Sequence, residues 1–257
     1  MTALPTTKKA ATIYGSRVGL KPGRSYTLDL LWYAVFLPSA NDAAIGVAEA
    51  NGGIGKTIDE MNAIAADLQA RDTHAKTPNG LDAPGQTSSA YDLALIARAG
   101  LAREDFAKYA GTARAEFPNV KGKRTHTIYN TNRLLLHGYD GIVGVKTGFT
   151  TQAGRTYVGA ATRGGTTLIV AAMGIHESSE TAARKLLDWG FANRDRVAPI
   201  GTLVSPISEG GTPVPESTPS PSATPTAPSV APAPERSPLA AVVVTPDDRD
   251  PTISAQG

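Results

Sequence analysis

Apolar residues in the first half of the chain recur mostly at helical spacing. Leu28, Leu31, Trp32, Val35 and Phe36 share one helical face. The preceding Thr27 is a suitable N-cap, and Pro38 prevents the helix from continuing. The same spacing predicts helices over about 41–52, 57–68, 91–98 and 101–110. The buried stripe predicted for 57–68 consists of Ile58, Met61, Ile64, Ala65 and Leu68.

The second half of the chain shows strand patterns. Val143 and Val145 alternate with Gly144 and Lys146, which predicts a short strand with one buried face. Strands are also predicted over 155–162 and 167–173, joined by a glycine turn at 163–165. An amphipathic helix begins at Ser178 or Ser179 and runs to Phe191. A helical block followed by antiparallel strands and a closing helix indicates an α+β fold.

The composition changes near residue 205. Twelve of the nineteen prolines fall between Pro206 and Pro251, interleaved with serine, threonine and alanine. Such a segment buries too little apolar surface to offset its ordering entropy. We therefore expect a folded domain over 1–200 and a disordered Pro/Ser/Thr/Ala-rich tail over 205–257.

Charge and composition exclude several classes of protein. The chain has 25 basic and 23 acidic residues, and this balance argues against nucleic-acid binding. It has no cysteine, which excludes a disulfide and a thiol nucleophile. Its four histidines show no metal-ligand spacing, so we expect no metal and no cofactor. No run of residues is long and apolar enough to be a signal peptide or a membrane anchor in this chain.

The strand over 143–148 ends in a combination suited to an anionic peptide end. Lys146 supplies a positive charge and Thr147 a hydroxyl donor, while Gly148 lets another backbone come close. Taken alone, the triplet also fits an ordinary strand end with an exposed lysine.

A second triplet gives Lys146-Thr-Gly148 more meaning. Together with Ser39-Ala-Asn41 it resembles two of the three signature elements of serine penicillin-recognising enzymes. The setting of Ser39, in residues 36–44, is similar to that in low-molecular-weight D-alanyl-D-alanine carboxypeptidases (S11-type peptidases, serine penicillin-binding proteins). Five more segments, within about residues 1–195, resemble that family: 18–23, 77–81, 89–94, 130–135 and 186–191. The resemblance implies a β-lactamase/transpeptidase-like fold, with a helical subdomain and an antiparallel sheet flanked by helices.

The implied reaction removes the terminal D-alanine of a peptidoglycan stem peptide that ends in D-Ala-D-Ala. In the family a serine attacks the carbonyl and forms an acyl-enzyme, which water hydrolyses, and β-lactams inhibit it. By resemblance, Ser39 relays a proton to the leaving amine and Asn41 holds a substrate amide. The backbone N–H of Phe149 is half of an oxyanion hole.

The same resemblance assigns the binding residues. Lys146 attracts the terminal carboxylate, Thr147 hydrogen-bonds it, and Gly148 admits the peptide backbone. Thr150 is a further candidate for lining the site, although a strand-end hydroxyl is an equally good interpretation.

One departure from the family pattern concerns the nucleophile. The family serine stands in Ser-x-x-Lys, with the lysine as its base, and no such motif lies between Met1 and Ser39. Met1-Thr-Ala-Leu4 resembles the stretch that commonly follows it. We therefore expect an N-terminally truncated chain that lacks the signal peptide, the first strands and the nucleophile helix, and that is inactive as written.

Two alternatives stay open at this point. The chain could be a non-catalytic wall module that binds peptidoglycan peptides, or, less favoured by the motifs, a β-lactamase relative. The family resemblance implies the cell envelope or the extracellular space as its location.

Overall fold

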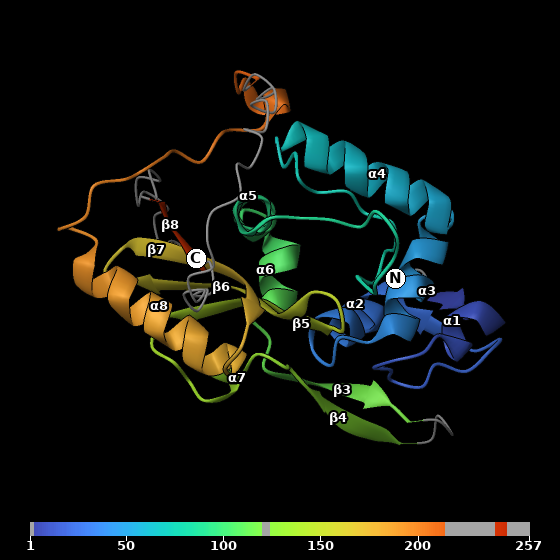
Figure 1. Ribbon diagram of the computed structural model, residues 1–257. Helices are drawn as coiled ribbons and strands as arrows, with labels where there is room; N and C mark the ends of the chain where they lie inside the picture. Colours follow the sequence, from blue (N-terminus) through green and yellow to red (C-terminus); the bar gives the residue numbers. More distant parts are fainter. Residues whose placement is uncertain (1–2, 120–123, 214–239, 246–257) are drawn as a thin grey trace, which may run out of the picture.

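The computed structural model describes residues 3–119, 124–213 and 240–245 (Figure 1). In chain order its elements are β1 (Ala3–Pro5), α1 (Lys8–Thr12), β2 (Ser25–Thr27), α2 (Leu28–Phe36), α3 (Asn41–Ala50), α4 (Ile54–Asp67), α5 (Ala90–Leu101), α6 (Glu104–Ala110), β3 (Arg114–Pro118), β4 (Thr125–Tyr129), α7 (Arg133–Leu136), β5 (Ile142–Thr150), β6 (Gly154–Arg163), β7 (Thr166–Ile175), α8 (Ser179–Asn193), a 3₁₀ turn (Ile207–Glu209) and β8 (Ala240–Thr245).

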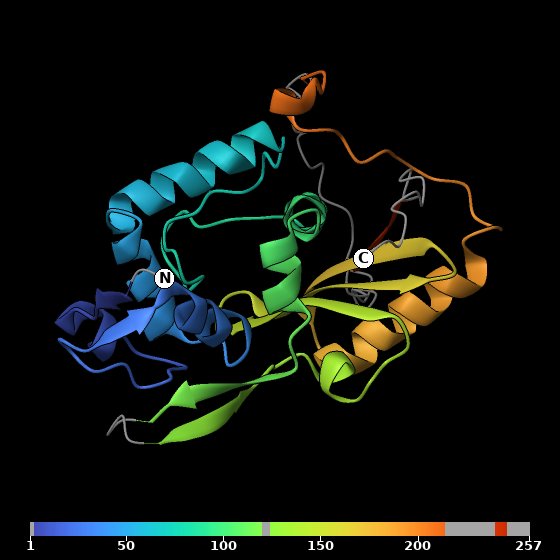
Figure 2. The same ribbon diagram turned by 180° about the vertical axis from the view of Figure 1, so that it is seen from behind.

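The helical block forms around α2. Thr27 caps this helix by accepting a hydrogen bond from the Leu30 N–H at 3.3 Å, as its position before the apolar run predicts. Leu31 and Phe36 are buried in one cluster with Phe117 of β3 and with residues of β4 and α6. The ribbon of β3 and β4 therefore closes one side of the block (Figure 2).

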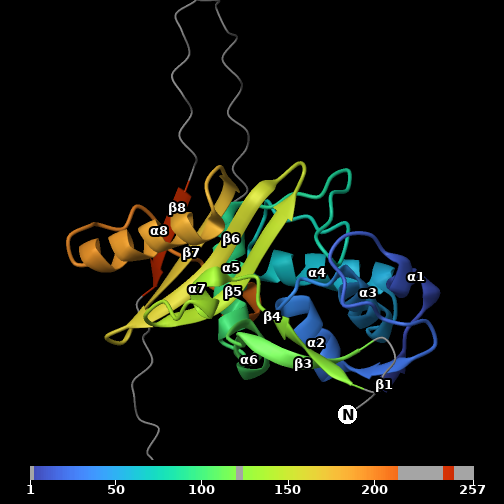
Figure 3. The ribbon, with the colours of Figure 1, turned by 90° about the horizontal axis from the view of Figure 1, so that it is seen from below.

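The sheet is antiparallel, and within the described residues its strand order is β5-β6-β7-β8. Alternate residues of β6 and β7 face opposite layers, as the two-residue period of a strand requires. Val158 and Ile169 pack with Ala94 of α5, whereas Tyr157 and Leu168 pack with Leu187 of α8. The sheet therefore lies between α8 on one face and α5 on the other (Figure 3). This architecture is the predicted α+β arrangement.

One prediction for the helical block needs correction, and one element was not predicted. The segment before Ser25, for which the sequence pattern predicts no helix, contains the short helix α1, capped by the Thr7 side chain. In α4, Met61 and Ile64 are exposed, by 38% and 60%, although the periodicity predicts them to be buried. The helix lies at the outer rim of the block, and it packs inward mainly through Ala65 (Figure 1).

Parts of the predicted tail adopt defined structure. The segment 202–213 runs across α4 and α5, where Gln69 donates to the carbonyls of Ser205 and Thr212 and Asp67 accepts from Ser208. Residues 240–245 form β8, which pairs antiparallel with β7. The backbone groups of both segments form hydrogen bonds with residues that are distant in the sequence. Composition alone does not reveal such partners. The rest of the predicted tail, 214–239 and 246–257, lies outside the described residues.

The helices of the described residues were compared with the requirements for a membrane span. None of the helices within 3–119, 124–213 and 240–245 has the length and apolar character that a bilayer span requires.

Candidate active site

The end of α2 positions Ser39. Pro38 cannot continue the helix, and Ser39 takes a left-handed conformation with φ of 58°. The chain then turns back, since Ala40 N–H donates to the carbonyl of Ala34 at 2.9 Å, and α3 begins at Asn41. A non-glycine residue at positive φ is uncommon and marks a backbone that its surroundings hold in place.

Asn41 is nearly buried, and its side chain contacts protein groups. Its amide donates to the carbonyl of Tyr14 at 3.1 Å and accepts from the amide of Asn79 at 3.1 Å. Its backbone N–H donates to the carbonyl of Ser16 at 2.8 Å. Asn41 therefore ties the start of α3 to the loop before residue 18, and in this structure it does not reach the hollow that Ser39 lines.

Asp42 holds the continuation of this loop, residues 18–20. Its fully buried carboxylate accepts hydrogen bonds from the backbone N–H groups of Val18, Gly19 and Leu20 at 2.9 to 3.2 Å. An acidic group buried with several donors is satisfied, whereas the same donors without it would be left unpaired. Asp42 was not among the predicted site residues, and it ties the loop over 18–20 to the start of α3.

The second predicted triplet lies on β5, at the edge of the sheet. Lys146 pairs with Val158 of β6, and Thr147 pairs with Tyr157. Because paired residues point to the same side of a sheet, Lys146 faces the α5 layer and Thr147 the α8 layer. Gly148 lies opposite Thr156, and a Cβ on it would stand 2.5 Å from the Thr156 hydroxyl oxygen. The absence of a side chain at Gly148 thus keeps the strand pair intact.

Lys146 carries a strongly perturbed amine. Burial lowers its pKa from the ordinary 10.5 to about 8, since low-dielectric surroundings disfavour the charged form. Its Nζ donates to the Thr147 carbonyl at 2.9 Å, and within the described part of the chain no carboxylate pairs with it. A bound anion would supply the missing counter-charge.

Thr131 joins the two predicted triplets. Its backbone N–H donates to the carbonyl of Leu37 at the end of α2, at 3.0 Å. Its hydroxyl lies 2.7 Å from the hydroxyl of Thr147. The buried neighbours Asn130 and Asn132 hold this segment, because Asn130 bonds the Thr112 carbonyl and the Asn132 N–H. Two regions more than 100 residues apart therefore meet across one residue.

Ser39 and the β5 triplet open onto one hollow of about 450 Å³. Of the predicted site residues it is lined by Ser39, Thr147, Gly148 and Phe149; Asn41, Lys146 and Thr150 stand outside its lining. The Thr150 hydroxyl accepts from the Ala153 N–H at 3.0 Å and serves the hairpin turn. The lining residues that sequence reasoning missed are Ser16, Pro38, Thr131, Arg133, Arg155, Tyr157, Ser178, Ser179 and Glu180.

Some of the missed residues gave a signal. Thr131 and Arg133 lie in the segment 130–135, which resembles the family and for which we predicted no role. Arg155 and Tyr157 begin a strand whose pairing with β5 decides their position, and the helix start at Ser178 was predicted only as a cap. Their grouping depends on tertiary structure rather than on local pattern.

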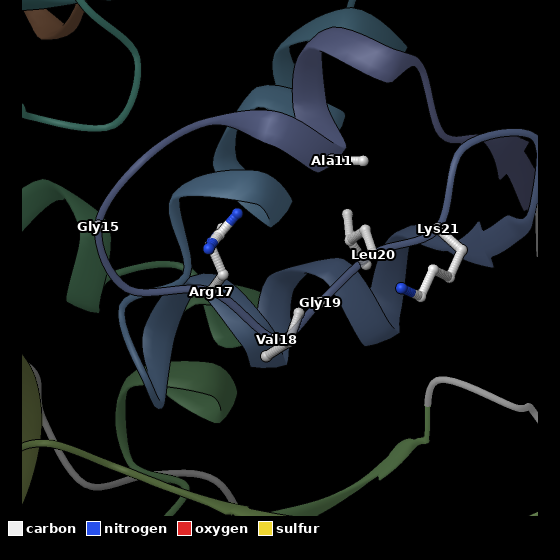
Figure 4. Close-up of a pocket in the computed structure, with 7 residues that line it drawn as sticks. All are labelled: Ala11, Gly15, Arg17, Val18, Gly19, Leu20 and Lys21. Carbon is white, nitrogen blue, oxygen red and sulfur yellow. The ribbon is translucent and has the colours of Figure 1, made fainter.

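A second hollow, of about 490 Å³, lies over the loop that Asp42 holds (Figure 4). Arg17 and Lys21 are on its rim, and Ala11 of α1 forms part of its wall. It contains none of the predicted site residues. We therefore assign the candidate site to the first hollow. Among the described residues no cluster of three or more His, Asp or Glu side chains is close enough to hold a metal ion.

The chain is similar to known proteins over this whole region. Residues 3–177 match the family model of the S11 peptidases, described as D-alanyl-D-alanine carboxypeptidase. The carboxypeptidase DacB2 of Mycobacterium tuberculosis is 45% identical over 193 residues, 72% of this chain and 65% of the relative. The carboxypeptidase DacF of Bacillus subtilis is 33% identical over 190 residues, 73% of this chain and 48% of the relative.

Solved structures agree with these relatives. The crystal structure of a D-alanyl-D-alanine carboxypeptidase from Mycobacterium tuberculosis H37Rv superposes with a TM-score of 0.71 at 40% identity, covering 79% of this chain and 77% of that one. A Streptomyces K15 DD-transpeptidase variant gives 0.68 at 30% identity, covering 74% and 79%. The chain spans less than two thirds of the length of the curated relatives it matches. On its fold and its matched residues, the chain belongs to the D-alanyl-D-alanine carboxypeptidase family of S11 peptidases, a family of hydrolases.

Proposed function

We propose that these residues form the substrate-binding part of a serine-type D-Ala-D-Ala carboxypeptidase site. The observation that carries this proposal is the single hollow lined by both Ser39 and the strand Thr147–Phe149. One side offers a hydroxyl at a constrained turn, and the other a strand edge with a threonine and a nearby, partly buried lysine. The substrate is a peptidoglycan stem peptide ending in D-Ala-D-Ala, and β-lactams compete for the same groove.

In this proposal the terminal carboxylate binds at Thr147. The Thr147 hydroxyl donates to it, and Lys146, on the other face of the strand, supplies positive charge to the same strand end. In a chain that also carries the family's Ser-x-x-Lys, Ser39 would relay a proton toward the leaving amine, because a hydroxyl donates and accepts at once. The N–H of Phe149 would then contribute to an oxyanion hole. The substrate-amide role expected for Asn41 stays a prediction, since its amide contacts Tyr14 and Asn79 here.

We further propose that the 257 residues bind the peptide without cleaving it. No Ser-x-x-Lys occurs anywhere in these residues. No serine is therefore followed, three residues later, by the lysine that serves as the base in the family. In this proposal the chain acts as the non-catalytic module that binds peptidoglycan peptides, and it does so in the cell envelope. The β-lactamase alternative requires the same serine and is disfavoured by the same observation.

A fluorescent penicillin tests the proposal, with a catalytically intact penicillin-binding protein labelled in parallel. We expect no covalent label on this chain after denaturation, and no hydrolysis of a chromogenic cephalosporin. We also expect unlabelled penicillin to displace a D-Ala-D-Ala peptide from the chain. A label that survives denaturation would contradict the non-cleaving proposal, and mass spectrometry of the labelled peptide would identify the serine.

A further inference from the structure

The turn end of the β5–β6 hairpin carries a cross-strand pair with unusual exposure. Phe149 and Arg155 are directly opposite each other in the strand register. The Phe149 side chain is 68% exposed, and the Arg155 guanidinium lies 5.7 Å from the centre of its ring. The ring therefore holds the arginine in place through a cation–π contact, and the guanidinium donors are still available to an anion.

Both side chains belong to the wall of the candidate site. Thr147, Phe149, Arg155 and Tyr157 point to the same side of the sheet, since Thr147 pairs with Tyr157 and Phe149 with Arg155. All four line the hollow that Ser39 also lines. Phe149 is two residues beyond Thr147 on the strand, which corresponds to about 7 Å along the strand direction.

The charge of the hollow is unbalanced. It is lined by two arginines, Arg133 and Arg155, and by one carboxylate, that of Glu180. Glu180 is already paired with His137 at 2.8 Å and with Arg184 at 3.6 Å. Within the described part of the chain, neither arginine of the hollow has a carboxylate partner. The chain as a whole has a net charge of only +2, so this local excess is a property of the site.

We propose that Arg155, held by Phe149, binds a second carboxylate of the substrate peptide, carried on the side chain of the third residue from the C-terminus. This inference rests on the proposed function, in which the terminal carboxylate binds at Thr147. A peptide lying antiparallel along β5 then passes from Thr147 toward Phe149 as it is followed upstream. Two residues upstream, also about 7 Å, its side chain reaches the level of Arg155. The chain should therefore bind peptides whose third residue from the C-terminus is acidic more tightly than peptides in which that residue is neutral or amidated.

Two matched peptides test this selectivity by isothermal titration calorimetry: acetyl-L-Glu-D-Ala-D-Ala and acetyl-L-Gln-D-Ala-D-Ala. The intact chain should bind the glutamate peptide about fivefold more tightly, as expected for one partly exposed charge pair. Arg155→Gln should reduce this ratio to about 1, because it removes the charge that distinguishes the two peptides. Arg17→Gln, which removes an exposed arginine at the other hollow, should leave the ratio at its original value.

The outcomes separate this inference from the function on which it rests. Lys146→Met should weaken both peptides by the same factor, because both carry the terminal carboxylate. A ratio of 1 in the intact chain, or an unchanged ratio in Arg155→Gln, would overturn the second-carboxylate site while Lys146→Met still weakens binding. If neither peptide binds, the proposed function fails, and the inference fails with it.

Discussion

Replacing Lys146 by methionine should stabilise the fold at neutral pH while it weakens anion binding. The amine is partly buried without a carboxylate partner in the described structure, and its pKa falls from 10.5 to about 8. A difference of roughly 2.5 pKa units corresponds to about 3 kcal/mol of penalty for the charged form. Methionine has a similar volume and no charge, so it removes this penalty. Loss of the 2.9 Å hydrogen bond to the Thr147 carbonyl lowers the gain in free energy of unfolding by about 1 kcal/mol.

The pH dependence of this gain has a fixed sign. The folded chain releases the proton near pH 8, whereas the unfolded chain keeps it to about 10.5. Below pH 8 the lysine is protonated in both states, and the full penalty opposes folding. As the pH rises from 8 to 10.5 the wild-type chain gains stability relative to Lys146→Met, and the penalty disappears.

Urea unfolding followed by tryptophan fluorescence measures the effect. At pH 7 the Lys146→Met variant should exceed the wild type by about 2 kcal/mol in free energy of unfolding. At pH 10 the charge penalty should fall below about 1 kcal/mol, which cancels the gain. The exposed Lys21→Met serves as the matched control and should change stability by less than about 0.5 kcal/mol at either pH. A destabilised Lys146→Met at pH 7, or a difference that is the same at both pH values, would refute the reasoning.

Three further substitutions, and Gly164→Ala as a control, test the elements around the site by urea unfolding. Asp42→Ala should cost about 3 kcal/mol or more, because it leaves three backbone N–H groups without their buried acceptor. Gly144→Ala should lower the free energy of unfolding by more than about 2 kcal/mol, since φ is 120° and the new Cβ would lie 2.3 Å from the Ala110 carbonyl oxygen. Gly164→Ala, in an open turn, should lower it by less. Thr131→Val should cost about 1 kcal/mol and weaken D-Ala-D-Ala peptide binding severalfold at unchanged circular dichroism; unchanged binding would exclude Thr131 as the link between the two walls.

Local signals predicted much of the fold. Thr27 and Ser178 cap their helices as their positions before apolar runs indicate, because a cap depends only on residues within one turn. The hairpin turn at 163–165 also follows from its glycines, both of which have positive φ. The helix α4 was less predictable: its period is helical, but burial of Met61 depends on a neighbour that the fold does not provide.

The candidate site was predictable only in its motifs. Ser39 and Thr147 were recognised from short sequence patterns, and the structure brings both to one hollow. The contact that joins them runs through Thr131, and Arg155 enters the site through strand pairing, so neither position follows from local sequence. Asn41 shows the converse, since a matching motif does not reveal that the side chain contacts Tyr14.

The central claim is that the strand end at Lys146 and Thr147 binds a D-alanine carboxylate. Calorimetric titration of acetyl-L-Gln-D-Ala-D-Ala and of its C-terminal amide, at pH 7 and pH 9, tests it most directly. We predict that the acid binds at least about tenfold more tightly than the amide at pH 7. This preference should weaken at pH 9, where Lys146 with a pKa of about 8 is largely neutral before binding. Equal affinities for the acid and the amide at pH 7 would contradict the claim.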